Sequence, residues 1–236
     1  MATKIIDLSM VTSSDPSPLM SVKITNVPHE SGAKEDQKYF DIDPDDWPFP
    51  GKSFADDYVE MTTHAGTHLD APWHMGPETE GKPGKTIDQW PLEWCFGDGV
   101  VIDIRDIPDG YALSAEEVQE RLRKIGYTLK PGDIFLVMTG NDKYWGKPEY
   151  SDRGGHLSCE ALEWILNQGV KTVGTDSWSF DIPYKHWVAN YMAHDRDPKE
   201  LWPCHLLGLK KNTPIMKSWL TWRHFLSLGL NFLAFP

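Results

Sequence analysis

The chain has 236 residues, of which 40% are hydrophobic and 12% aromatic, so it can bury a sizeable core and does not read as disordered. Its formal net charge of −12 argues against nucleic-acid binding, because phosphate contacts need clustered Lys and Arg. No apolar run approaches the roughly 18 residues of a membrane span, and no signal peptide is recognisable. Three widely spaced cysteines fit neither a disulfide framework nor a paired zinc knuckle, which favours a cytoplasmic location.

The first half of the chain alternates apolar runs with turn-forming stretches. Residues 4–8 predict a short strand. The segment 28–57 is rich in Pro, Asp and Gly and lacks periodicity, so we expect a functional loop or lid there. Further apolar runs predict buried strands over residues 100–104, 133–138 and 170–174.

Two helices are predicted between these strands. The first begins at Ser114, where Glu117 completes a capping box, and ends at Gly126. The second runs over residues 158–169, with an inward face of leucine and isoleucine. Residues 201–208 predict a short helix and residues 231–236 a terminal strand. The alternation of strands and helices indicates an α/β fold, and the length is compatible with a single domain over residues 1–236.

The densest chemical signal is residues 64–74, HAGTHLDAPWH, which hold three of the nine histidines and one aspartate. Imidazole and carboxylate together suit Zn, Mn or Fe. A helical metalloprotease motif does not fit, because Ala65 stands where such a motif needs its general-base Glu. In an extended segment, by contrast, His68 and Asp70 point to the same side, and a bend at Gly66 lets His64 join them.

This segment resembles the signature H-x-G-T-H-x-D-x-P-x-H of the metal-dependent cyclase-like hydrolases, which include bacterial kynurenine formamidase and isatin hydrolase. Every fixed position matches. Residues 86–104, 131–140 and 170–181 resemble later stretches of the same family. The resemblance implies a swivelling β/β/α fold, usually dimeric, in an α/β single domain.

The resemblance also implies the roles of several residues. The residues at His64, His68 and Asp70 bind a metal, and His74 donates and accepts protons. A bound cation acidifies its water and polarises the substrate carbonyl, so that metal-bound hydroxide is the nucleophile. His205, in the segment HLLG, matches a later histidine ligand of the dinuclear members.

Lys217 departs from the family pattern. The dinuclear members carry a bridging Glu twelve positions after the later histidine, where this chain has Lys217. An ammonium group cannot bridge two cations and repels a second one. We therefore expect one divalent metal ion, Mn or Zn, with Lys217 supplying the charge of the missing second ion; the alternative is that Lys217 points to solvent.

Substrate contacts are expected from aromatic residues and one acid. Trp47 and Phe49 fall where family members keep an aromatic residue near the substrate, and Trp73 lies within the motif. Asp176 follows a predicted strand, at the end where α/β sites lie, although a turn or capping role is equally compatible with Asp176 and its neighbour Asp181.

The resulting hypothesis is a cytoplasmic homodimeric hydrolase that cleaves an amide-type C–N bond in a small aromatic or cyclic molecule, with no nucleic-acid or membrane partner. A lactone or ester hydrolase, or a dehydrating cyclase of secondary metabolism, is the alternative within enzymes. A non-catalytic descendant that binds a small molecule is the alternative outside them.

Overall fold

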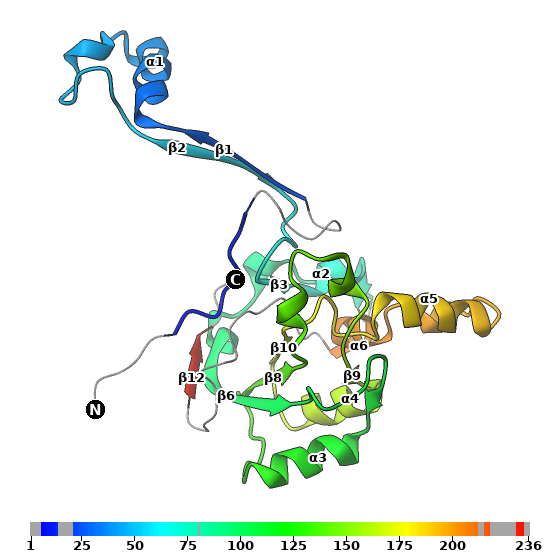
Figure 1. Ribbon diagram of the computed structural model, residues 1–236. Coiled ribbons are helices and arrows are strands. Elements are labelled where there is room, and N and C mark those ends of the chain that lie inside the picture. Colours follow the sequence, from blue (N-terminus) through cyan, green and yellow to red (C-terminus); the bar gives the residue numbers. More distant parts are fainter. Residues whose placement is uncertain (1–5, 14–20, 80, 212–214, 218–229, 234–236) are drawn as a thin grey trace. The chain divides into compact units, whose positions relative to one another are not determined.

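The computed structural model describes residues 6–13, 21–79, 81–211, 215–217 and 230–233 (Figure 1). The chain divides into two compact units, one formed by Met1–Val11 and Gly66–Pro236 and the other by Thr12–Ala65. All the strands and helices predicted above lie in the larger unit. Among the described residues, no helix is both long and apolar enough to span a membrane.

A six-stranded mixed sheet is the centre of the larger unit. Its strands are, in spatial order, β12 (Leu230–Leu233), β6 (Phe96–Asp103), β8 (Ile134–Met138), β10 (Thr172–Thr175), β11 (Ile215–Lys217) and β3 (His68–Asp70). The four inner strands run parallel, and both edge strands pair antiparallel to their neighbours. The motif strand β3 is therefore an edge strand of the sheet.

Strand β8 shows why the sheet is buried on both faces. All five of its residues, Ile-Phe-Leu-Val-Met, are buried, and successive side chains of a strand point to opposite faces. Phe135 and Val137 join the core beneath the helices. Ile134, Leu136 and Met138 join a second core that also contains Leu69 of β3.

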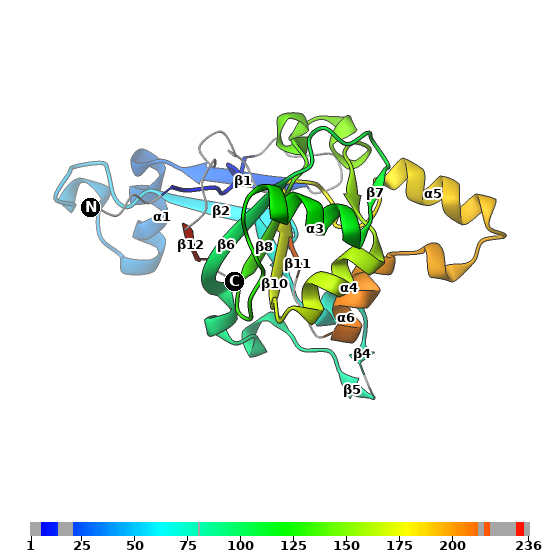
Figure 2. The ribbon, with the colours of Figure 1, turned by 90° about the horizontal axis from the view of Figure 1, so that it is seen from below.

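Three helices cover one face of the sheet (Figure 2): α3 (Ala115–Lys124), α4 (Cys159–Asn167) and α6 (Pro203–Lys211). The predicted capping box of α3 is confirmed, because Ser114 Oγ accepts from Glu117 N at 3.3 Å and Glu117 Oε2 accepts from Ser114 N at 2.8 Å. Helix α4 begins after Ser158, whose hydroxyl caps Ala161 N at 3.1 Å. The mixed α/β fold class is thus as predicted.

The remaining elements of the larger unit are short or peripheral. They are α2 (Pro72–Met75), β4 (Glu78–Thr79), β5 (Lys82–Pro83), β7 (Ala112–Leu113), β9 (His156–Leu157), α5 (Tyr184–Ala193) and the 3-10 helices η2 (Ile87–Gln89), η3 (Leu92–Cys95), η4 (Asn141–Tyr144), η5 (Pro148–Ser151) and η6 (Pro198–Glu200). Helix α5 was not predicted, and none of its residues is buried. The predicted first strand is wrong over residues 6–8, which form no strand, although Leu8 is buried in the second core. Of the predicted terminal strand, residues 234–236 lie outside the described part.

The smaller unit contains a two-stranded antiparallel hairpin, β1 (Val22–Val27) and β2 (Asp56–Met61), with α1 (His29–Phe40) and η1 (Pro44–Asp46) between its strands. The segment 28–57, which was predicted to be a functional loop or lid, therefore contains the helix α1; its role as a loop or lid over the substrate stays a prediction. This helix has few apolar residues and so gives no periodic signal. It is held instead by close packing at Gly32, where a Cβ atom would overlap the carbonyl oxygen of Phe54.

Candidate metal centre

The segment 64–74 folds as a turn, a three-residue strand and a short helix. Gly66 adopts φ +71°, a left-handed conformation that glycine reaches without strain, and this turn precedes β3. Thr67 Oγ1 accepts a hydrogen bond from Met10 N at 2.8 Å, which ties the turn to the N-terminal segment. Pro72 then occupies the first turn of α2, where its missing N–H costs nothing.

Asp70 is at the centre of the site. Its side chain is fully buried, and imidazoles approach both of its oxygens. His68 Nε2 lies 3.1 Å from Oδ1, as expected for residues two apart on one strand. From Oδ2, His205 Nε2 lies at 3.8 Å and His74 Nε2 at 4.0 Å.

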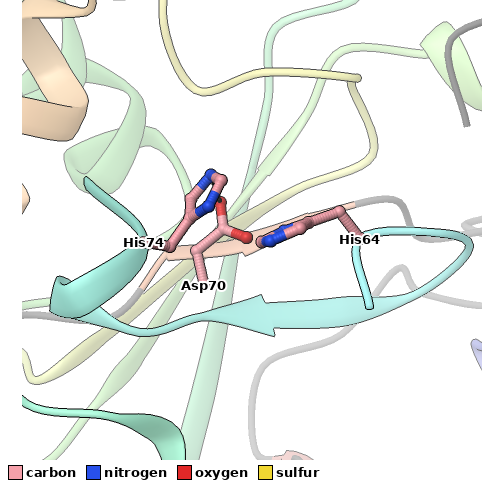
Figure 3. Close-up of side chains that lie close together, drawn as sticks. All are labelled: His64, Asp70 and His74. Carbon is pink, nitrogen blue, oxygen red and sulfur yellow. Dashed lines mark ion pairs between the residues drawn. The ribbon is translucent and has the colours of Figure 1, made fainter. Parts of the chain in front are cut away.

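His64 completes this arrangement from the turn before β3. One donor atom from each of His64, Asp70 and His74 can be chosen so that all three lie within 4.8 Å of one another (Figure 3). His74 points toward the carboxylate from α2 and keeps 40% of its side chain exposed. The structure thus brings together His64, His68, Asp70, His74 and His205.

In two of the histidines, Nδ1, the ring nitrogen that does not face Asp70, is hydrogen-bonded to another group. His68 Nδ1 lies 2.8 Å from the carbonyl oxygen of Gly66. His205 Nδ1 is hydrogen-bonded to Asp181 Oδ2. Because a carbonyl and a carboxylate only accept, each Nδ1 carries a proton, and each Nε2 is left as the atom that would bind a cation held at Asp70. Metal-binding histidines are oriented in this way.

Asp181 holds His205 in place. It is 3% exposed, and besides the ring it accepts Cys204 N at 2.6 Å and His205 N at 3.3 Å, so it also caps the start of α6. Burial raises the pKa of Asp181, but the hydrogen bonds from the His205 ring and from the backbone N–H groups of Cys204 and His205 outweigh burial and hold the pKa below its ordinary value. Asp181 therefore stays ionised near neutral pH.

The residues fit a divalent cation. One buried carboxylate with several imidazole nitrogens around it is a donor set that Zn, Mn or Fe accepts. A buried anionic oxygen is stabilised by a neighbouring cation. The role of Asp181 could not be predicted from the sequence, because its partner His205 lies 24 residues further along the chain. The one signal was the position of Asp181 in DSWSFD, after a predicted strand.

The environment of Asp176 differs from the one expected of a residue that contacts substrate. It is fully buried, and its carboxylate accepts Thr139 N, Thr139 Oγ1 and Gly140 N, each at 2.7 Å. Burial raises the pKa of Asp176 to about 6, against these hydrogen bonds. The contacts join the ends of β8 and β10, so the geometry favours a structural role over the substrate contact proposed from sequence.

The other predicted residues lie in three places. Trp73 is 52% exposed, next to His74 on α2. Trp47 and Phe49 line an apolar pocket of about 670 Å³ within the smaller unit, with Phe54 and Pro48. The backbone of Lys217 pairs with His68 in the register of β11 and β3, while its side chain lies outside the described part of the chain.

A buried aspartate ringed by histidines at the edge strand of a mixed sheet defines an α/β protein with a candidate metal centre. Residues 6–182 match the family model described as "Putative cyclase". The chain therefore belongs to the cyclase family. The match covers the motif segment and Asp181, while His205 lies beyond it.

Curated relatives cover part of the chain. Kynurenine formamidase of Erythrobacter litoralis is 28% identical over 126 residues, 52% of this chain and 49% of the relative. Kynurenine formamidase of Salinibacter ruber is 25% identical over 124 residues, 52% of this chain and 51% of the relative. The chain thus spans about half the length of the curated relatives it matches.

Solved structures share the fold over nearly the whole chain. Isatin hydrolase A from Labrenzia aggregata, bound to benzyl benzoate, matches with a TM-score of 0.73 and 18% identity, covering 99% of this chain and 87% of that one. Isatin hydrolase A from Ralstonia solanacearum matches with a TM-score of 0.70 and 19% identity, covering 95% and 82%.

Proposed function

We propose that the chain is a metal-dependent hydrolase that cleaves an amide-type C–N bond in a small cyclic amide or N-acyl aromatic molecule. The observation that carries this proposal is the fully buried carboxylate of Asp70, which is faced by the Nε2 atoms of His68, His74 and His205. The names of the relatives, kynurenine formamidase and isatin hydrolase, describe hydrolases of non-peptide C–N bonds and support this reaction class.

One divalent ion, Mn or Zn, is proposed as the cofactor, with His64, His68, Asp70 and His205 as its ligands. When bound, such a cation acidifies a water molecule and polarises the carbonyl under attack. Asp70 supplies the negative charge, and the Gly66 carbonyl and Asp181 keep the two imidazoles in the tautomer that can bind.

His74 is proposed to move protons during the reaction. Its Nε2 lies 4.0 Å from Asp70 Oδ2, and its side chain is 40% exposed, so the ring can reach both the centre and a bound substrate. An imidazole exchanges protons readily near pH 7 and can pass one to the leaving nitrogen. Lys217 is proposed to supply a positive charge close to the centre, since its backbone pairs with His68.

We propose that Trp47, Phe49 and Trp73 contact the substrate, and that the protein is a cytoplasmic homodimer. The free state of the three cysteines fits the cytoplasm.

The exposed hairpin of the smaller unit supports the proposal of a dimer. All six residues of β2 are exposed, including Tyr58 and Val59. An isolated two-stranded hairpin is marginally stable in water, so contact with a second chain would stabilise it. Light scattering should report two chains per particle, and Val59→Lys should shift this toward one.

The main test is turnover of a panel of amides and lactones. The metal-loaded protein should hydrolyse at least one amide, lose turnover with EDTA and regain it with Mn or Zn. Turnover of lactones alone would favour the ester-hydrolase alternative. Binding of panel members without turnover, with every metal tried, would favour a non-catalytic binding protein.

Metal analysis tests the single-ion proposal separately. One equivalent per chain is expected, and two equivalents would contradict it. Lys217→Glu should then raise the stoichiometry toward two, since a carboxylate replaces an ammonium group at the proposed position of a second ion.

A further inference from the structure

Four aromatic side chains form a closed cluster beside the candidate metal centre. The ring centroids of Trp178 and Tyr184 are 6.2 Å apart, and those of Tyr184 and Trp187 are 5.4 Å apart. Trp187 and Trp202 are separated by 5.0 Å, and Trp202 and Trp178 by 5.8 Å. We name these four residues the aromatic shelf.

The aromatic shelf is not part of the hydrophobic core. None of its four residues belongs to either core cluster of the larger unit. Tyr184 is 46% exposed, and the three tryptophans are only partly buried. Two of the four rings come from α5, which has no buried residue. Large apolar rings left partly exposed in one place commonly mark a binding surface.

The aromatic shelf is continuous with the metal centre. The ring of Trp202 meets that of His205 edge to face, with centroids 5.0 Å apart. His205 Nε2 in turn lies 3.8 Å from Asp70 Oδ2. Trp202 also has φ +54°, a left-handed conformation that is strained for a bulky residue. Such strain is concentrated at functional sites, and here it occurs one residue before α6 begins.

The cluster also has unmet hydrogen-bonding capacity. The indole N–H groups of Trp178 and Trp187 are buried and have no acceptor among the described residues. Tryptophan can only donate, and a buried donor without an acceptor is costly. A ligand with a carbonyl or carboxylate oxygen would supply the missing acceptor, whereas a purely hydrocarbon ligand would not.

We propose that the aromatic shelf binds a planar aromatic ring of the substrate beside the amide bond that is cleaved, and so sets a preference for substrates with an aryl ring over those with a saturated ring. This rests on the proposed hydrolase function. A planar ring can stack on an indole face with its whole face at van der Waals distance, while a puckered cyclohexane ring of similar size makes fewer contacts and lacks the aromatic quadrupole. Where the ring carries the carbonyl, the product of hydrolysis is an aryl carboxylate, which keeps both the ring and the acceptor oxygens.

The test compares matched substrates on matched variants. Benzamide and cyclohexanecarboxamide, together with their methyl-ester counterparts, differ in the planarity of a ring of similar size, and comparing the same pair on wild type and variants cancels their different intrinsic reactivity. Trp187→Leu should lower the ratio of aryl to cyclohexyl kcat/KM about fivefold to tenfold, as expected from one lost aromatic contact. Trp187→Phe keeps a ring and should retain most of the preference. Trp94→Leu, which alters a tryptophan outside the shelf, should leave the ratio unchanged.

A binding measurement separates this proposal from the hydrolase proposal. Quenching of tryptophan fluorescence in the metal-loaded protein should show benzoate binding more tightly than cyclohexanecarboxylate, and Trp187→Leu should abolish the difference. If this binding preference is found while no substrate is hydrolysed, the proposal for the aromatic shelf is supported and the proposed hydrolase function is contradicted. Equal binding of the two acids, preferential binding of tetramethylammonium, or an unchanged substrate ratio in both Trp187 variants would overturn the shelf.

Discussion

The candidate metal centre is built from two regions of different character. The segment 64–74 brings its histidines and Asp70 together through local geometry, because a turn, a strand and a helix follow one another within eleven residues. The pair Asp181 and His205 reaches the same carboxylate from separate parts of the fold, the stretch after β10 and the helix α6. Donors close in sequence are thus fixed by spacing, and donors far apart by tertiary packing.

The largest effect is expected in the local region. Asp70→Asn removes the one charge that faces His68, His74 and His205, and should abolish metal binding and lower kcat/KM by about a thousandfold or more. The metal content after dialysis and the turnover of the best amide measure this. Asp88→Asn, at an exposed position, is the control, and full metal content in Asp70→Asn would contradict the assignment.

His74→Gln sharpens the role of the motif's last histidine. If His74 transfers protons, kcat should fall about a hundredfold while metal affinity is retained, because general acid–base groups contribute on this scale. The pH profile of kcat should lose one limb as well. A loss of bound metal equal to that of His64→Gln would instead make His74 a ligand, an arrangement that its place in the His64–Asp70–His74 group also allows.

Asp181→Asn probes the distant region. An amide can present its NH₂ group to His205 Nδ1, which favours the wrong tautomer, so metal affinity should fall tenfold to a hundredfold, roughly the effect seen for such supporting carboxylates. Titration calorimetry with Mn or Zn gives the affinity. Circular dichroism should show a retained fold, and unchanged affinity would mean that His205 is not a ligand.

The smallest effect concerns the pH dependence of stability near the distant region. Burial lowers the pKa of His156 from 6.5 to about 4. The unfolded chain therefore binds this proton more readily, and the stability that is present above pH 6.5 is lost progressively as the pH falls toward 4. Urea unfolding at several pH values measures this loss as the difference between the wild type and His156→Phe, because Asp176, whose pKa is raised, contributes the opposite dependence over the same range.

The matched variants for that measurement are His156→Phe and His194→Phe. The first should flatten the pH dependence between 6.5 and 4. The second alters an exposed histidine and should leave the dependence as it is. Identical curves for the two variants would show that His156 is not the group responsible.

The contrast between the regions also explains what could be predicted. The caps of α3 and α4 and the apolar run of β8 follow local rules, and they were predicted. Helix α1 was missed because it has few apolar residues and is held by close packing at Gly32, and α5 because it buries none of its residues.

The same holds within the site. His64, His68, Asp70, His74 and His205 were all singled out from sequence, but the partnership of Asp181 with His205 depends on where α6 packs, which no spacing along the chain reveals. Asp176, the residue directly after β10 and similar by sequence, accepts three hydrogen bonds from the end of β8 instead.

The edge position of β3 has a consequence for how the protein matures. In the described sheet this strand pairs only with β11, where Ile215 lies opposite Asp70 and Lys217 opposite His68. The two paired strands are far apart in the sequence, so they are made at very different times during synthesis. Contacts of such high sequence separation form late in folding. A nascent chain that already displays the whole of residues 64–74 would therefore hold its ion weakly, and tight loading would coincide with completion of the sheet.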